Sequence, residues 1–173
     1  MKNIELKVAV KDFKEVNLLL NKIKAKGAGK LIQKDFYYIC PNGRLKIREI
    51  KNKQFELIFY RRQDKKNSKL SDYQVLPLNK SQKQILKYIL ARACGELIAV
   101  KKIRNLWIYK HTRIHLDQVD KLGKFLELET VVKNINLKKA KIEHNEVIMK
   151  LNLSKYKKID KSYSDLLIKK VRK

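Results

Sequence analysis

The sequence predicts an α+β protein, built on an antiparallel sheet with helices packed on its outside. Segments such as "NIELKVAV" and "TRIHLDQV" alternate apolar and polar residues with the period of a β-strand. Short polar turns separate several of these segments, as consecutive antiparallel strands require. Helical patterns with capping residues follow the first strand, precede the last three strands and recur at the end of the chain.

The first predicted element is a strand over residues 3–10, followed by a helix within residues 11–29. We expect Asp12 to cap this helix, with Glu15 completing a capping box three residues later. Gly27 is the expected end of the helix, because glycine readily adopts the left-handed conformation that follows a helix.

A hairpin follows, with strands over 31–40 and 44–50. Asn42-Gly43 predicts a tight turn between them, since both residue types tolerate a positive φ. A short polar turn then leads into another strand over 55–62.

The second half repeats this order after a polar segment over 63–69, which fits either a mobile lid or a linker. A short strand over 72–78 precedes a helix that starts at Ser81, forms a capping box with Gln84 and ends at Gly95. Three strands and two helices complete the prediction, at 97–109, 112–119, 124–132, 137–151 and 162–170.

The composition is strongly basic. Forty-three Lys and Arg against 17 Asp and Glu give the 173-residue chain a formal net charge of +26. Such an excess favours phosphate-bearing partners, namely nucleotides, nucleic acid such as RNA, or anionic lipid. A lysine-rich proteome would produce the same surface charge. The length fits one domain spanning residues 1–173, with the oligomeric state left open between monomer and homodimer.

The sequence shows no apolar run long enough to cross a membrane, and its first residues lack the apolar segment of a signal peptide. We therefore expect a cytoplasmic protein with no membrane partner. Cys40 and Cys94 lie too far apart for a zinc or redox motif, so both thiols are expected to be buried and reduced.

The predicted strands carry many charges on one face. If the sheet closes on itself, one face becomes an outer apolar surface and the other an interior. The outer set would be Leu45, Ile47, Phe55, Leu57, Phe59, Ile114, Leu116, Phe125, Leu126 and Leu128. The inner set would be Glu5, Lys7, Lys46, Arg48, Arg62, Lys102, Arg104, Arg113, Asp117, Glu127 and Glu129.

A charged interior is costly unless its members pair with each other or with a ligand. A polyphosphate with a divalent cation satisfies both signs, because Lys and Arg bind phosphate oxygens and carboxylates bind the metal. The alternative is an ordinary solvated face with incidental ion pairs. His115 shares the face of Arg113 and Asp117, where it would contact substrate, tune a carboxylate or simply pack. His111 and His144 are expected at the surface.

Several segments resemble the CYTH domain, the family of class IV adenylyl cyclases and thiamine triphosphatases. They are "NIELK", "GRLKIREI", "ELIFYRR", "RIHLDQVDKLGKFLELE" and the "SYSDLL" tail, so the resemblance spans about residues 1–170 and is closest to the cyclase-like branch. This family belongs to the triphosphate tunnel metalloenzymes. The resemblance implies a closed eight-stranded antiparallel β tunnel with helices outside, binding a triphosphate and a divalent metal, Mg²⁺ or Mn²⁺.

The resemblance also assigns residues. Its E-x-E-x-K signature reads Asn3-Ile4-Glu5-Leu6-Lys7 here, so the first glutamate is an asparagine, and Tyr60 stands where the family often has a lysine. The implied metal ligands are Glu5, Asp117, Glu127 and Glu129. The implied substrate-binding residues are Lys7, Lys46, Arg48, Arg62, Lys102, Arg104 and Arg113. Those implied to be catalytic are Lys7, Arg48, Arg104 and Arg113.

Three functions follow as hypotheses. The first, which the resemblance favours over the other two, is an adenylyl cyclase that converts ATP to cyclic AMP and pyrophosphate, with Tyr37, Tyr38 and Trp107 as candidate residues for stacking on adenine. The second is a triphosphatase acting on thiamine triphosphate, tripolyphosphate, a nucleotide or an RNA 5′-triphosphate. The third is a non-catalytic protein that binds nucleotides or RNA.

Overall fold

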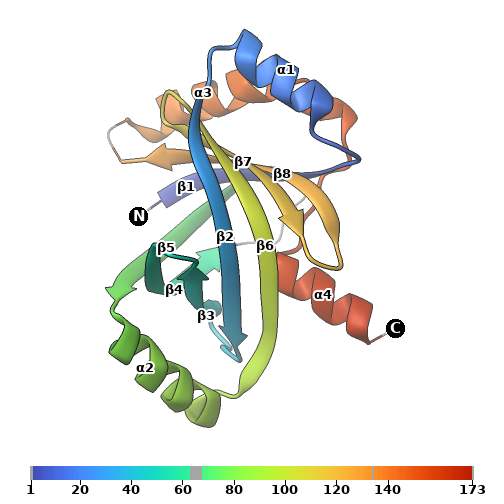
Figure 1. Cartoon of the computed structure of the whole chain (residues 1–173). Coiled ribbons are helices and arrows are strands. Elements are labelled where there is room, and N and C mark those ends of the chain that lie inside the picture. Colours follow the sequence, from blue (N-terminus) through green and yellow to red (C-terminus); the bar gives the residue numbers. More distant parts are fainter. Residues whose placement is uncertain (1, 63–67, 134, 173) are drawn as a thin grey trace.

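The computed structural model describes residues 2–62, 68–133 and 135–172, without the side chains of Arg62 and Lys69. Within these residues, eight antiparallel strands close into a barrel in the order β1-β5-β4-β3-β2-β6-β7-β8, and β8 pairs with β1 to complete the ring. The same described part of the chain forms four α-helices, which lie around this barrel (Figure 1). The predicted fold class, a closed eight-stranded antiparallel tunnel with helices outside, is therefore confirmed.

All eight predicted strands are present, and several are longer than the sequence pattern indicated. Their bounds are β1 Lys2–Val10, β2 Lys26–Tyr38, β3 Arg44–Ile50, β4 Gln54–Arg62, β5 Lys69–Leu78, β6 Glu96–Tyr109, β7 Thr112–Val119 and β8 Gly123–Val132. The segment predicted as a lid or linker over 63–69 falls mostly outside the described residues.

The first helix differs from the prediction at both ends. It is α1, Lys14–Lys22, and neither end uses the expected residue. Asp12 accepts a hydrogen bond from the Lys14 backbone (2.8 Å) but forms no capping box, because Glu15 turns away to Lys155 and to the Tyr156 hydroxyl (3.2 Å). The chain leaves the helix at Lys24, which has a φ of +56°, and Gly27 already belongs to β2.

The second helix, α2 (Lys80–Ala93), begins before the predicted capping box. Asn79, rather than Ser81, is its cap: the Asn79 side chain accepts from the Gln82 backbone (2.8 Å), and the Gln82 side chain accepts from the Asn79 backbone (2.9 Å). The predicted end is confirmed, because Gly95 follows the helix with a φ of +80°.

The two C-terminal helices, α3 (Leu137–Lys150) and α4 (Tyr163–Val171), lie where the sequence pattern placed them. The short 3-10 helix η1 (Leu153–Lys155) lies between them in the chain. In the part of the chain that the structure describes, no helix is long and apolar enough to cross a membrane.

The predicted tight turn at Asn42-Gly43 is wrong in detail. β2 ends at Tyr38 and β3 begins at Arg44, so the connection is longer than two residues, and Asn42 does not have a positive φ. Gly43 is needed for a different reason. A Cβ there would lie 2.8 Å from the Tyr60 carbonyl oxygen, so only glycine fits this close approach to β4.

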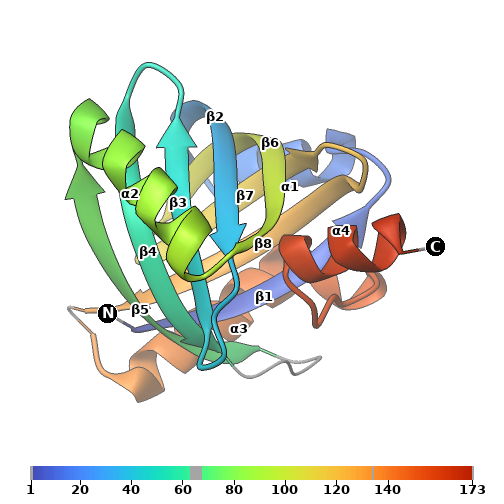
Figure 2. The ribbon, with the colours of Figure 1, turned by 90° about the horizontal axis from the view of Figure 1, so that it is seen from below.

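The outer apolar face is covered where the helices lie. The main core lies between the outer faces of β1, β7 and β8 and the helices α1 and α3, and its buried members include Leu6, Leu20, Ile114, Leu128 and Val147. Burial of each such side chain stabilises the fold by about 1.5–3 kcal/mol. Figure 1 shows α1 and α3 together over this side, and Figure 2 shows α2 across the outer side of β3 and β4.

A second cluster closes one end of the barrel. Tyr163 and Leu167 of α4 pack against Tyr37, Val100 and Phe125. Phe125 was predicted on the outer apolar face, but it shares the face of Glu127 two residues later and points toward this end of the interior. The barrel is therefore blocked by apolar side chains at the α4 end, which positions Tyr163 beside the polar interior.

Candidate functional site

The interior of the barrel is the candidate site. It encloses a cavity of about 270 Å³ that is lined by residues from all eight strands and by Ser162 and Tyr163. A larger hollow, about 1120 Å³, lies outside the barrel between α3, the β2–β3 connection and the start of α4. The interior is the stronger candidate because it gathers the buried charged groups.

Asp35 on β2 is the centre of one half of the interior. Its carboxylate is fully buried and accepts hydrogen bonds from Lys46 (2.8 Å), Arg48 (2.8 and 3.0 Å) and Lys102 (3.4 Å). Burial alone would raise the pKa of Asp35, but Arg48, Lys102 and Lys46 hold it well below its usual value. Three predicted phosphate-binding residues are thus held together by one carboxylate.

Asp35 was missed by the sequence analysis. The available signal was its alternation with Gln33 and Tyr37 along a predicted strand, which puts all three side chains on one face. Tyr37 does lie in the interior, where its hydroxyl accepts a hydrogen bond from Lys46 (3.3 Å).

The cations around Asp35 differ in their protonation. Burial lowers the pKa of Lys102 to about 7, although Asp35 opposes this shift. For Arg48, burial also favours the neutral form, but the nearby Asp35 outweighs it and raises the pKa above its ordinary value. Arg48 is therefore a permanent cation, whereas Lys102 is close to titration at neutral pH.

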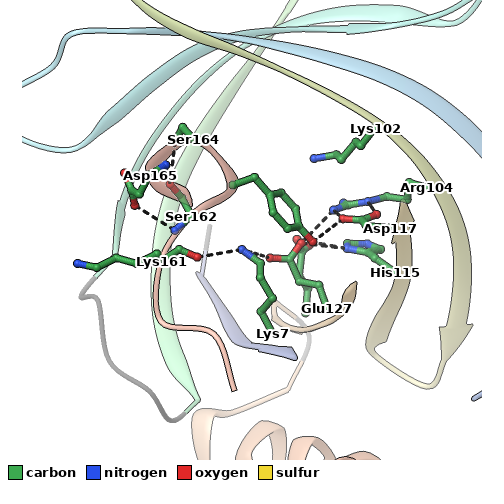
Figure 3. A network of polar contacts seen from close by, with 12 residues as sticks. Lys7, Lys102, Arg104, His115, Asp117, Glu127, Lys161, Ser162, Ser164 and Asp165 are labelled. Carbon is green, nitrogen blue, oxygen red and sulfur yellow. Dashed lines mark hydrogen bonds and ion pairs between the residues drawn. The ribbon is translucent and has the colours of Figure 1, made fainter. Parts of the chain in front are cut away.

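Arg104 on β6 is the centre of the other half. Its guanidinium donates two hydrogen bonds to Asp117 (2.7 and 2.6 Å) and one to Glu127 (2.9 Å). The Tyr163 hydroxyl donates to Asp117 as well (3.0 Å). Figure 3 shows Arg104, Asp117 and Glu127 converging in this network. Both Asp117 oxygens, predicted to bind metal, are thus engaged by protein donors.

Lys7 lies beside Glu127, on the Arg104 side of the interior. Its ammonium is 3.4 Å from Glu127, donates to the Lys161 carbonyl (3.4 Å) and lies 4.0 Å from the centre of the Tyr163 ring (Figure 3). The side chain is almost fully buried. The segment that leads into α4 therefore fixes the position of this predicted substrate-binding residue.

Arg113 and Glu129 pair across β7 and β8 at 2.9 Å. Asn3 lies beside them: with its amide oxygen turned toward Arg113, it accepts a hydrogen bond from the guanidinium (3.1 Å) and its nitrogen donates to the Lys2 carbonyl (3.0 Å). Asn3 thus supports Arg113 in the position where the family signature has its first glutamate. Glu5 lines the same cavity opposite Glu129 in the strand register.

His115, Glu127 and Glu129 form a group that could hold a metal ion, with one ligand atom from each within 4.8 Å of the others. The His115 Nδ1 lies 3.8 Å from Glu127 and 3.6 Å from Glu129. Two ligands that are each about 2.1 Å from a metal can be at most about 4.2 Å apart, so one ion can bridge either pair. The residues present therefore fit a divalent cation.

The other histidines, Trp107 and Tyr38 do not line this cavity. His111 is at the surface as predicted, but His144 is buried, with its ring bonded to Thr130 (2.9 Å) and Ser68 (3.0 Å). Trp107 packs against the outer core and Tyr38 is buried. Cys40 and Cys94 are free thiols but only partly buried, in contrast to the prediction.

Eleven inward residues were predicted, and the structure gathers most of them in one cavity. Lys7, Lys46, Arg48, Lys102, Arg104, Arg113, Glu5, Glu127 and Glu129 line it directly. Asp117 lies behind Arg104 and Glu127, and the Arg62 side chain lies outside the described residues. Glu56, Tyr60 and Tyr73 also line the cavity, and sequence analysis did not assign them to it.

The fold and the site together define a class of proteins, closed antiparallel β tunnels whose interior carries buried, mutually paired charges. Sequence comparison gives the family. The chain belongs to the CYTH domain family, whose model matches residues 1–163.

Individual relatives agree with this assignment. A Methanocaldococcus jannaschii protein named as a candidate adenylate cyclase is 30% identical over 96% of this chain and 98% of its own length. Among solved structures, the PH1012 protein of Pyrococcus horikoshii has a TM-score of 0.83, with 23% identity over 95% of this chain and 98% of that chain. HpAC1 of Hippeastrum, described as a candidate adenylyl cyclase with a dominant triphosphatase activity, has a TM-score of 0.65, with 12% identity over 94% and 92% of the two chains.

Proposed function

We propose that this protein is a metal-dependent triphosphatase that holds its substrate's phosphates inside the tunnel and hydrolyses the terminal phosphoanhydride bond. The observation that carries this proposal is the cluster of Lys46, Arg48 and Lys102 around Asp35. Even with Glu56, whose carboxylate lies 4.0 Å from Arg48, the cluster keeps a surplus of positive charge whenever Lys102 is protonated. Phosphate oxygens supply the missing negative charge, and in a buried site that attraction is stronger than in water.

The carboxylate wall of the cavity could bind the divalent metal ion that accompanies a triphosphate substrate. His115, Glu127 and Glu129 are the residues that would hold a Mg²⁺ or Mn²⁺ ion. When bound, the ion would neutralise charge on the phosphate oxygens and favour attack by water. Glu5 lines the same wall and is proposed as a further ligand, and Asp117 is proposed to act mainly by holding Arg104.

The remaining predicted residues take roles that follow from their contacts. Lys7 contacts Glu127 of the carboxylate wall, and both Lys7 and Lys102 face the Tyr163 ring, so we assign Lys7 to a phosphate oxygen on that side of the cavity. Arg48 is assigned to the phosphate that is attacked, because it remains charged at every relevant pH. Arg104 and Arg113 hold Glu127 and Glu129 and complete the charge balance when substrate enters. Arg62 remains a proposed substrate contact.

Hydrolysis is favoured over cyclisation by what lies around the cavity. A cyclase must hold adenine as well as the phosphates, and of the three residues expected to stack on the base, Trp107 and Tyr38 are used in packing and Tyr37 bonds to Lys46. A triphosphatase needs only the phosphates. Adenylyl cyclase activity is the second candidate, supported by the name of the Methanocaldococcus jannaschii relative.

The test is an assay of the purified protein with tripolyphosphate, thiamine triphosphate, ATP and a short 5′-triphosphorylated RNA, each with Mg²⁺ or Mn²⁺. Release of orthophosphate supports the proposal. Cyclic AMP with pyrophosphate would select the cyclase, and binding without any product would select a nucleotide- or RNA-binding protein. Glu129→Gln should lower turnover by about 100-fold or more, since a metal-binding carboxylate is lost. Glu146→Gln, outside the tunnel where α3 meets the end of β6, is the matched control and should retain full activity.

A further inference from the structure

The His115 ring has an unused buried nitrogen. Within the described residues, its Nδ1 has no hydrogen-bond partner, although the side chain is only 4% exposed. A buried nitrogen without a partner costs free energy, so its persistence calls for an explanation. The ring stands on β7 between Arg113 and Asp117 and points into the tunnel (Figure 3).

The two carboxylates beside it are bound by neighbouring cations, but each carboxylate oxygen has two lone pairs, so those nearest the imidazole can still accept a metal ion. Arg113 forms an ion pair with Oε2 of Glu129, and Oε1 of Glu129 lies 3.6 Å from His115 Nδ1. Lys7 lies at Oε1 of Glu127, and Oε2 lies 3.8 Å from Nδ1 while accepting from Arg104. The distances from His115 Nδ1 to Glu127 and to Glu129 are too long for a hydrogen bond, but they are short enough for one cation to bind both atoms of either pair.

The chemistry of this ligand set distinguishes between metals. Mg²⁺ prefers oxygen ligands alone, whereas imidazole nitrogen is a good ligand for first-row transition ions. A site made only of carboxylates would bind Mg²⁺ and Mn²⁺ on similar terms. One buried nitrogen shifts that balance.

We propose that His115 Nδ1 is a direct metal ligand together with Glu127 and Glu129, and that it makes this site select transition-metal ions such as Mn²⁺ and Co²⁺ over Mg²⁺. The inference rests on the metal site of the proposed function and names its preferred cation. It assigns to His115 a specificity-determining role rather than a role in packing or in orienting a carboxylate.

The experiment is calorimetric titration of the substrate-free protein with MgCl₂, MnCl₂ and CoCl₂. The wild-type protein should bind Co²⁺ and Mn²⁺ more tightly than Mg²⁺. His115→Gln should weaken Co²⁺ and Mn²⁺ binding by about 10-fold or more, because even groups that only support a ligand are worth that much. Mg²⁺ binding should change by less than about threefold, since glutamine still offers an oxygen ligand.

Two variants serve as controls. His111→Gln changes an exposed histidine outside the tunnel and should leave all three affinities unchanged. Glu129→Gln should weaken all three ions together. If His115→Gln weakens Mg²⁺ and Co²⁺ equally, His115 supports the site without selecting the metal, and the proposal is overturned. If it weakens neither, the ring is not a ligand.

A spectroscopic measurement on the wild-type protein keeps the test independent of how the variant folds. Electron spin-echo spectroscopy of bound Mn²⁺ should show coupling to a directly coordinated ¹⁴N nucleus, and its absence would overturn the proposal. None of these readouts involves turnover. Triphosphate hydrolysis with Mg²⁺ and no nitrogen coupling would refute the inference alone, and nitrogen coupling without hydrolysis would refute the proposed function alone.

Discussion

Asp35 shows at the scale of a single residue how the tunnel tolerates its charge. Its carboxylate is fully buried and is the shared partner of Lys46, Arg48 and Lys102. Charged groups so deeply buried are stable only when paired, and removal of one partner leaves the others without compensation. Asp35 therefore positions the three cations that are proposed to bind phosphate.

We expect Asp35→Asn to lower the free energy of unfolding by about 3–5 kcal/mol, the usual cost of breaking a buried ion pair from one side. Urea unfolding at pH 7 measures this. Tripolyphosphate should restore much of the lost stability, because its oxygens replace the carboxylate. Asp120→Asn, in the exposed turn after β7, is the control and should unfold like the wild type. A stable Asp35→Asn protein would show that the cations do not depend on this carboxylate.

Lys102 gives the site a pH dependence. Burial lowers its pKa to about 7 from an ordinary 10.5, against the opposing effect of Asp35. As the pH rises through about 7, the ammonium of the ligand-free protein loses its proton and the phosphate cluster loses one charge. The affinity for tripolyphosphate should therefore fall as the pH is raised from about 6 to about 9.

The control for this prediction is Lys102→Arg, because an arginine stays charged throughout that range. The affinity of this variant for tripolyphosphate should vary much less with pH when both proteins are titrated under the same conditions.

The free energy of unfolding of the ligand-free wild type should rise with pH, whereas its affinity for tripolyphosphate falls. Between about 7 and 10.5 the unfolded chain holds a proton that folded Lys102 has lost, so this group makes the fold more stable as the pH rises. Parallel pH profiles of tripolyphosphate affinity for the wild type and Lys102→Arg would show that Lys102 is not the titrating group.

At the scale of elements, α4 connects the end of the barrel to the site. Its capping box, formed by Ser162 and Asp165, fixes where the helix starts, and Asp165 also binds Arg44 of β3 (2.8 Å). This places Tyr163 in the tunnel, with its ring against Phe125 (5.1 Å between ring centres) and its hydroxyl on Asp117. Through these contacts the last helix of the chain supports residues on β1, β7 and β8.

Tyr163→Phe tests this connection, since it removes only the hydroxyl. We expect a loss of about 1.5–3 kcal/mol in the free energy of unfolding, the contribution of a hydrogen bond to a buried charged group. The loss should be visible in urea denaturation at neutral pH. Tyr88→Phe, on the exposed side of α2, should cause no change. A loss below about 0.5 kcal/mol for Tyr163→Phe would mean that Arg104 alone satisfies Asp117.

At the scale of the whole molecule, the net charge of +26 attracts any polyanion, so binding alone does not identify the site. The salt dependence of binding distinguishes the contribution of the exposed lysines from that of the buried cations. Exposed lysines act through water, and at 1 M salt their influence extends only about 3 Å. The buried cations of the tunnel act at contact distance and are screened much less.

We therefore expect Arg48→Ala to weaken tripolyphosphate binding at both low and high salt. Lys101→Ala removes an exposed charge from the adjoining outer face of β6, and its effect should disappear at high salt. Titrations of both variants at about 0.05 and 1 M NaCl test this difference. Equal salt dependence for the two variants would indicate that binding occurs on a diffuse basic surface.

Local sequence patterns predict most of the strands and helices of this fold. The alternation along 112–119 and 124–132 determines both the strands and the face on which Arg113, Glu127 and Glu129 lie, because side chains alternate sides in any strand. The resemblance of the same segments to the CYTH domain then predicted that the sheet closes into an eight-stranded tunnel and assigned roles to the charged residues of its inner face. The predicted helix ends were less accurate. Glu15 pairs with residues far along the chain instead of capping α1, and α2 is capped by Asn79 instead of Ser81. A local sequence pattern contains no information on such competing partners.

The pairing inside the tunnel was decided only by the tertiary structure. Asp35 and Lys102 are 67 residues apart, and their contact exists because β2 and β6 are neighbours in the closed barrel. The burial of His144, the inward position of Phe125 and the use of Tyr163 as a partner of Asp117 likewise depend on which elements meet. The sequence by itself determined which faces carry charge, because that follows from a period of two along each strand. Only the folded chain decided which charges neutralise each other, and that the buried Nδ1 of His115 has no hydrogen-bond partner among the described residues, because both depend on distances between strands that no local pattern contains.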